Sequence, residues 1–191
     1  MAATVKTAVS VILLSLLPGT LGHGIVKRQE EGNGQGPEAR EVTPGSGVYA
    51  YTTGGAYISM FIITTDGLMV IDPMSKGHSE QMLVEIRKIT NAPIKYLFYS
   101  HNHYDHAKGG QVFKDEGATI VAHIDAYDYI KDNPSQDLVL SDMKWTGDRF
   151  DLTLGDTQIE LHHAGISHGN GMTTFVLPKE KVSKLRSAQS N

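Results

Sequence analysis

From residue 47 onward, apolar residues fall into short runs that predict strands, and one clear helical pattern lies among them. Segment 56–73 contains two apolar runs joined at Asp66–Gly67, a pair typical of a tight β-hairpin turn. Segment 79–89 follows, and its apolar residues recur on one helical face: Met82, Leu83, Ile86 and Ile89. This spacing predicts a helix with Ser79 as its N-cap. The apolar run 94–100 then predicts a buried strand.

The rest of the chain continues to alternate between strand and helix patterns. A hairpin that turns at Gly155–Asp156 is predicted over 149–165, and further strands are predicted over 47–53, 118–123 and 172–178. Helical patterns occupy 109–117 and 124–132. Because strands alternate with helices, the chain is predicted to adopt an α/β layered fold.

The N-terminal part differs from this pattern. Lys6 precedes a run of about ten apolar residues, and small residues at Thr20 and Gly22 suit a signal peptidase. We expect residues 1–22 to be a signal peptide and the protein to be secreted, since so short a run does not span a bilayer as a helix. Residues 23–46 are rich in Gly, Glu, Gln and Pro, which predicts a disordered linker.

Composition narrows the classes of function. The 191-residue chain has a formal net charge of −4 and no basic stripe, so a nucleic-acid partner is not expected. It has no cysteine, which excludes disulfides, thiolate metal sites and a cysteine nucleophile. Apart from the signal peptide, no segment is long and apolar enough to act as a membrane anchor.

The stretch YSHNHYDHAKGG, residues 99–110, concentrates potential metal ligands directly after a predicted strand. In an extended segment, alternate side chains face the same way, so His101 and His103 can converge on one ion and Asp105 can share that side. His106 points differently and suits a neighbouring ion. Imidazole and carboxylate groups are the ligands that zinc prefers in a protein without cysteine. The stretch therefore predicts a metal site.

The segment HNHYDH, residues 101–106, matches the HxHxDH signature of the metallo-β-lactamase superfamily. The upstream hairpin resembles the opening strands of that family, and AGISHGNGMTTFVLP (164–178) resembles its later segment, in which a Gly-rich turn presents a further histidine. The resemblance implies an αβ/βα sandwich. It also implies a first zinc ion held by His101, His103 and His168, and a second held by Asp105 and His106. Asp105 would in addition orient the attacking hydroxide as a catalytic residue.

The resemblance covers a metallo-β-lactamase-like domain over residues 47–180, and the chain departs from the family after it. The family supplies further acidic, cysteine or histidine ligands beyond the third histidine, whereas KEKVSKLRSAQSN (179–191) contains no Asp, Cys or His. We therefore expect residues 181–191 to be an atypical polar tail. The domain is expected to be C-terminally truncated, with its second half largely missing and its second metal site incomplete.

The leading functional prediction is a secreted, zinc-dependent hydrolase with one or two Zn²⁺ ions. In such an enzyme, a metal-bound hydroxide attacks the amide or ester carbonyl of a small-molecule, lactam-like substrate. One alternative is a thioester hydrolase of the glyoxalase II type. Another is a truncated, non-catalytic metal-binding protein, which the missing ligands favour.

The other histidines are not assigned as ligands. His162 and His163 are adjacent on a predicted strand, so one should face the interior and the other solvent. His123 ends a strand and is expected to cap the next element or to lie at the edge of the core. Trp145 and Tyr104 are open to two interpretations, as part of a substrate cleft or as packing residues.

Overall fold

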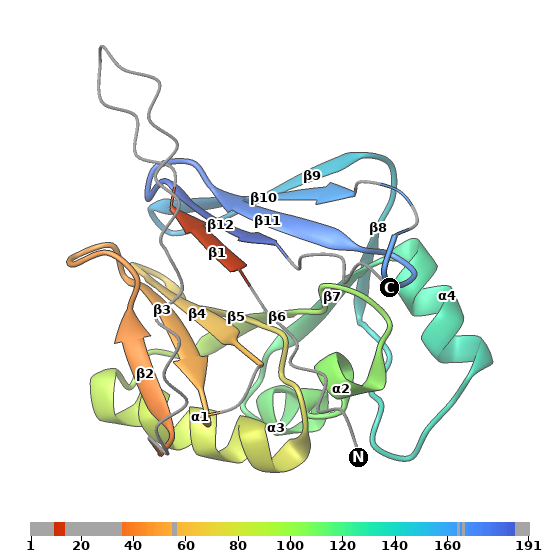
Figure 1. Cartoon of the computed structure of the whole chain (residues 1–191), viewed down its shortest axis with the longest axis horizontal. Helices are drawn as coiled ribbons and strands as arrows, with labels where there is room; N and C mark the ends of the chain where they lie inside the picture. Colours follow the sequence, from red (N-terminus) through yellow and green to blue (C-terminus); the bar gives the residue numbers. More distant parts are fainter. Residues whose placement is uncertain (1–9, 14–35, 55–56, 164, 166, 186–191) are drawn as a thin grey trace, which may run out of the picture.

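The computed structural model describes residues 10–13, 36–54, 57–163, 165 and 167–185, which form two β-sheets facing each other (Figure 1). The larger sheet has seven strands in the order β2-β3-β4-β5-β6-β7-β8. Strands β2 to β5 pair antiparallel, whereas β5 to β8 pair parallel. The bounds are β2 (Glu38–Glu41), β3 (Val48–Thr52), β4 (Ser59–Thr64), β5 (Gly67–Ile71), β6 (Ile94–Phe98), β7 (Thr119–His123) and β8 (Met143–Trp145).

Helices connect the parallel strands, as parallel pairing requires. Helix α1 (Lys76–Ile89) joins β5 to β6, and the short helices α2 (Tyr104–Ala107) and α3 (Gly110–Asp115) lie between β6 and β7. Helix α4 (Ile124–Asp132) leads from β7 towards β8. Figure 1 shows α1 and α3 beneath the larger sheet, on the side away from the smaller sheet. Every residue of β5 is buried, because both faces of that strand are covered.

The smaller sheet is antiparallel, with the strand order β1-β12-β11-β10-β9. Buried and more exposed residues alternate along β10 and β11, as expected for a sheet with one covered face. The strands are β1 (Ser10–Leu13), β9 (Arg149–Leu154), β10 (Thr157–His163), β11 (Thr173–Leu177) and β12 (Val182–Leu185).

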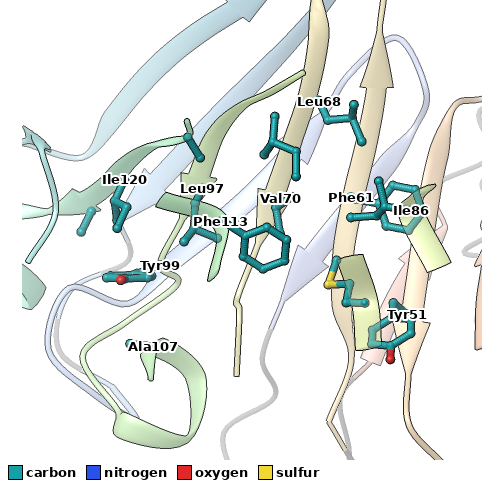
Figure 2. Close-up of a cluster of buried hydrophobic side chains, with 14 of the residues drawn as sticks. Tyr51, Phe61, Leu68, Val70, Ile86, Leu97, Tyr99, Ala107, Phe113 and Ile120 are labelled. Atoms are coloured by element: carbon teal, nitrogen blue, oxygen red, sulfur yellow. The ribbon is translucent and has the colours of Figure 1, made fainter. Parts of the chain in front are cut away.

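Two hydrophobic clusters hold the layers together. One lies between the larger sheet and its helices, and Figure 2 shows part of it, including Phe61, Val70 and Phe113. The other lies between the two sheets, where Phe98 of the larger sheet meets Phe175 of the smaller one at a ring separation of 5.7 Å. Both faces of the larger sheet are therefore buried. This arrangement holds the C-terminal ends of β6 and β7 at a defined position next to the smaller sheet.

The predicted α/β sandwich is confirmed, and its second half is only partly represented. That half has its sheet, but all four helices in the described residues precede β9. None of these helices has the length and apolar composition needed to span a bilayer.

Three local predictions were wrong. Helix α1 begins at Lys76 rather than after Ser79, because the Ser75 side chain accepts the hydrogen bond from the His78 N–H and caps the helix. Ser79 is instead buried inside the helix, where its hydroxyl donates to the carbonyl of Pro73. Residues 38–41 of the predicted linker form β2, which pairs with β3. Residues 182–185 of the predicted polar tail form β12, in which Val182 and Lys184 are buried.

The N-terminal predictions fall largely outside the described residues. Within the predicted signal peptide, only residues 10–13 are described, and they form β1 at the edge of the smaller sheet. Strand β1 pairs with β12 in the register that places Ser10 opposite Leu185.

Candidate metal centre

The histidine-rich stretch leaves the larger sheet at the C-terminal end of β6. The backbone of Tyr99 still donates to Val121 of β7, and Ser100 accepts from the N–H of Thr173 at the start of β11. The stretch is thus held between the two sheets where they approach each other. Irregular backbone at the ends of parallel strands is the usual position for ligand-binding residues in α/β proteins.

The expectation of one extended segment through Asp105 was wrong. His103 has extended backbone and is the N-cap of α2, so the helical turn begins at Tyr104. His101 and His103 belong to the extended part, whereas Asp105 and His106 lie on the helical turn. The Asp105 side chain is 44% exposed and that of His106 is 3% exposed, and His106 Nε2 lies 3.8 Å from Asp105 Oδ2.

Three imidazoles gather at this position. His101 is fully buried, His103 and His168 are half-buried, and one ring nitrogen of each lies within 4.8 Å of the other two. The ring centroids of His103 are 4.6 Å from those of both His101 and His168. We call this group the three-histidine site. It unites residues from the loop after β6 and from the loop between β10 and β11.

The loop that carries His168 is fastened directly to the histidine-rich stretch. Asn102 Oδ1 accepts from the N–H of Asn170 at 2.7 Å, and the Asn102 N–H donates to the Asn170 carbonyl at 3.2 Å. A side chain at Gly169 would place its Cβ 2.8 Å from Asn102 Oδ1 and 2.9 Å from the His101 ring. The glycine therefore permits the close approach that brings His168 to its partners.

The other nitrogen of His101 is held by a buried polar network. Ser100 Oγ lies 2.8 Å from His101 Nδ1 and 2.9 Å from Asp72 Oδ2, and the Ser100 N–H donates to Asp72 Oδ1. Because the single hydroxyl proton of Ser100 is donated to the Asp72 carboxylate, the hydroxyl accepts from His101 Nδ1–H. This fixes the tautomer of His101 in which the lone pair is on Nε2. Such orientation by a hydrogen bond is typical of histidines that bind metals.

Asp72 is the centre of this network. Its carboxylate meets the Lys184 ammonium at 2.7 Å and His106 Nδ1 at 3.4 Å, and both Asp72 and Lys184 are buried. Burial alone would raise the pKa of Asp72, but Lys184 and the hydrogen bond with His106 hold the pKa well below its usual range. The lysine comes from β12, so a charge from the smaller sheet supports the site built on the larger one.

His78 lies close to this network, and burial together with the charge of Lys184 lowers the pKa of His78 to about 4. Its Nε2 is 2.8 Å from Ser59 Oγ, and the Ser59 hydroxyl donates to the Asp72 carbonyl at 2.5 Å. The hydroxyl proton is thereby used, so Nε2–H of His78 is the donor to Ser59.

The remaining histidine and aromatic side chains considered in the sequence lie outside the three-histidine site. His123 accepts from the Asp125 N–H and caps α4, as the sequence suggested. His163 is the more buried of the adjacent pair and His162 faces outward, where it meets Glu160. Trp145 is buried and packs edge-on against His123, which favours the packing interpretation. Tyr104 is 40% exposed.

The predicted site residues thus divide into two sets. The structure brings His101, His103 and His168 together with mutually close nitrogens. Asp105 and His106 lie beside them, but no third His, Cys or carboxylate of the described residues joins that pair in a comparable group. Three imidazoles fit the ligand set of a catalytic zinc ion, which keeps its fourth position for water or substrate, rather than that of a closed structural one.

Sequence reasoning missed Asp72 and Lys184. Asp72 sits in VIDP, where an acidic residue before proline is typical of a turn, and Lys184 lies in a segment that reads as a polar tail. The alternation of Val182 and Lys184 in a short strand was the only available signal, and a lysine at a buried strand position is not expected without a known partner.

Comparisons with known proteins agree with this architecture. The model of the metallo-beta-lactamase superfamily matches residues 52–182. The 2,4-dinitroanisole O-demethylase subunit alpha of Nocardioides sp. (strain JS1661) is 25% identical over 131 residues, which are 68% of this chain and 40% of that protein. The linear primary-alkylsulfatase of Pseudomonas sp. (strain ATCC 19151) is 40% identical over 52 residues, which are 27% of this chain and 10% of that protein.

Solved structures give the same result. BJP-1, a subclass B3 metallo-beta-lactamase of Bradyrhizobium japonicum, is similar with a TM-score of 0.60 at 25% identity, covering 69% of this chain and 54% of that one. A metallo-beta-lactamase from Pontibacter korlensis is similar with a TM-score of 0.64 at 19% identity, covering 75% of this chain and 67% of that one. The chain therefore spans about half the length of BJP-1 and less than half of the demethylase subunit. From the family match over most of its length and from this shared fold, the chain belongs to the metallo-beta-lactamase superfamily.

Proposed function

We propose that this protein is a zinc-dependent hydrolase that acts on an amide or ester bond of a small, lactam-like molecule. The observation that carries the proposal is the convergence of His101, His103 and His168, with ring nitrogens within 4.8 Å of one another. A zinc ion bound there would lower the pKa of a water molecule to about 7 and polarise a carbonyl oxygen.

The chain's own residues would contribute orientation and proton handling. Ser100 holds the His101 ring in the tautomer whose lone pair is on Nε2, and the loop contact between Asn102 and Asn170 positions His168. The partly exposed Asp105 carboxylate would accept a proton from the attacking water and orient it. His106 is held by Asp72 on its Nδ1 side.

A substrate panel tests the proposal. The purified full chain is assayed with a chromogenic cephalosporin, an aryl ester, a glutathione thioester, a linear primary alkyl sulfate and 2,4-dinitroanisole. The last two represent the chemistry in the names of the two relatives. Hydrolysis of the cephalosporin or ester that is lost with a chelator, restored by zinc and abolished by His103→Ala supports the proposal.

Other outcomes select the alternatives. Turnover of the thioester alone would favour a glyoxalase II type of enzyme and contradict the lactam-like substrate. Stoichiometric zinc binding without turnover of any of the five substrates would favour the non-catalytic metal-binding form. The incomplete ligand set around Asp105 and His106 supports that alternative.

We also propose that residues 1–22 are a signal peptide, which the basic Lys6 and the following apolar run support. Cleavage would remove β1 and leave the β12 edge without that partner. Intact-mass measurement of the protein from the culture medium of a secreting host tests this. A mature form beginning near His23 is expected, and a secreted form that retains Ser10–Leu13 would contradict it.

A further inference from the structure

A second group of potential metal ligands lies where α4 meets the smaller sheet. It consists of His123 at the end of β7, Asp125 in the first turn of α4, and His163 at the end of β10. One ligand atom of each lies within 4.8 Å of the other two. These residues are separate from the three-histidine site and have no part in the function proposed above. We call them the His–Asp–His cluster.

Two of the three distances within the cluster match those between ligands of a single small metal ion. Asp125 Oδ2 is 3.4 Å from His123 Nδ1 and 3.4 Å from His163 Nε2. Ligands bound at about 2.0–2.1 Å in a tetrahedral zinc site lie about 3.3–3.4 Å apart, so two of the three edges already have this length. The third edge, between the two imidazole nitrogens, is at most 4.8 Å long. The two rings are stacked with their centroids 3.9 Å apart, so on binding they would rotate until both in-plane lone pairs point at the ion.

The hydrogen bonds of His163 prepare it as a ligand. Its Nδ1 lies 3.0 Å from the carbonyl of Met172, and a carbonyl only accepts, so Nδ1 carries the proton. In the neutral ring the lone pair is then on Nε2, which is the nitrogen that faces Asp125. A metal-binding histidine typically donates its other N–H to a backbone carbonyl or a carboxylate in this way.

His123 is oriented by its surroundings as well. It is 3% exposed, stacks on the ring of His163, meets the ring of Trp145 edge-on, and directs Nδ1 towards Asp125. The same nitrogen accepts a long hydrogen bond of 3.3 Å from the Asp125 N–H, so its lone pair is present and only weakly engaged. Asp125 remains half-exposed, which leaves a side of the cluster open to an entering ion.

We propose that His123, Asp125 and His163 form a second, independent site for a divalent transition metal such as zinc. The site lies at the base of the loop that carries His168, because His163 and Met172 are the two ends of that loop. A metal there would tie α4 to both ends of the loop and would rigidify the support of His168.

The test measures metal binding with the three-histidine site disabled. The full chain with His101→Ala and His103→Ala is titrated with Co²⁺, and binding is followed by visible absorption and by metal analysis after desalting. One equivalent of cobalt is expected to remain bound. Adding Asp125→Asn or His163→Ala should weaken this binding by more than the roughly 10–100-fold typical of losing a supporting residue.

Two controls make the result specific. His162→Ala removes the neighbouring histidine that faces outward to Glu160, and it should leave the cobalt equivalent unchanged. Asp125→Asn preserves size at a half-exposed position, so circular dichroism should show an unchanged fold. The proposal would be overturned by absent binding in the double variant. It would equally be overturned by binding that survives Asp125→Asn and His163→Ala but disappears with His106→Ala. Neither result would bear on hydrolysis at the three-histidine site.

Discussion

The three-histidine site and the His–Asp–His cluster are built from the same kinds of side chain but are supported differently. The first depends on buried charge: His101 is oriented by Ser100, and Ser100 by Asp72, which pairs with Lys184 from the opposite sheet. The second depends on backbone groups, namely the Met172 carbonyl and the first turn of α4. The first site should therefore be sensitive to changes of charge, and the second to changes in loop and helix backbone.

Substitution within the buried ion pair of Asp72 and Lys184 should cause the largest loss of stability. Asp72→Asn preserves shape but leaves the buried Lys184 ammonium without the Asp72 carboxylate, and removing one member of a buried pair costs about 3–5 kcal/mol. Urea denaturation should show this loss in the free energy of unfolding. The double variant Asp72→Asn/Lys184→Met should be more stable than the sum of the single losses predicts. Additive losses would show that the two charges do not support each other.

Low pH should lower the free energy of unfolding, because His78, which lies beside the Asp72–Lys184 pair, is protonated more readily in the unfolded chain. The pKa of His78 is about 4 in the folded protein and about 6.5 in the unfolded chain, because burial disfavours the charged ring. The unfolded state therefore binds the proton more readily. This contribution to stability is fully present above pH 6.5 and is lost as the pH falls through about 4, in total about 3 kcal/mol.

A variant isolates this contribution. His78→Gln retains a donor for Ser59 Oγ but cannot titrate. Its unfolding free energy, measured in denaturant between pH 7 and pH 4, should fall less steeply than that of the wild type. Equal slopes for the two proteins would show that His78 is not the titrating group.

The secondary structure and the side chains that form the two sites could be predicted from the sequence to different degrees. The strand and helix patterns and the ligands of residues 101–106 lie close together in sequence, so periodicity and spacing indicated them. His168 was found only through family resemblance. The pairing of Asp72 with Lys184 joins positions from different sheets, and the meeting of His123 with His163 joins β7 to β10. Such contacts depend on how the sheets pack, which no local pattern encodes.

Substitutions of two glycines in the loop between β10 and β11 should each affect metal binding at a different one of the two sites. A Cβ at Gly171 would lie 2.6 Å from the backbone nitrogen of Ala126 in α4, and Gly171 has a φ of +68°. Gly171→Ala should therefore lower the free energy of unfolding by about 1–3 kcal/mol. It should also weaken cobalt binding at the His–Asp–His cluster, because α4 carries Asp125. In Gly169→Ala the added methyl meets Asn102 and His101 instead. This change should weaken metal binding at the three-histidine site alone. Indistinguishable effects of the two variants on both sites would contradict the division between them.

The contact between Asn102 and the loop should give the smallest change in stability but a specific change in metal affinity. Asn102→Ala removes the acceptor for the Asn170 N–H and should cost about 0.5–1.5 kcal/mol in unfolding free energy. Because this contact positions His168, zinc affinity at the three-histidine site should fall by about 10–100-fold, measured by competition with a chromophoric chelator. Asn102→Asp keeps an acceptor at the same atom and should retain most of the affinity. If both variants bound zinc as the wild type does, His168 would be held by its own loop, and backbone packing rather than side-chain contacts would support both sites.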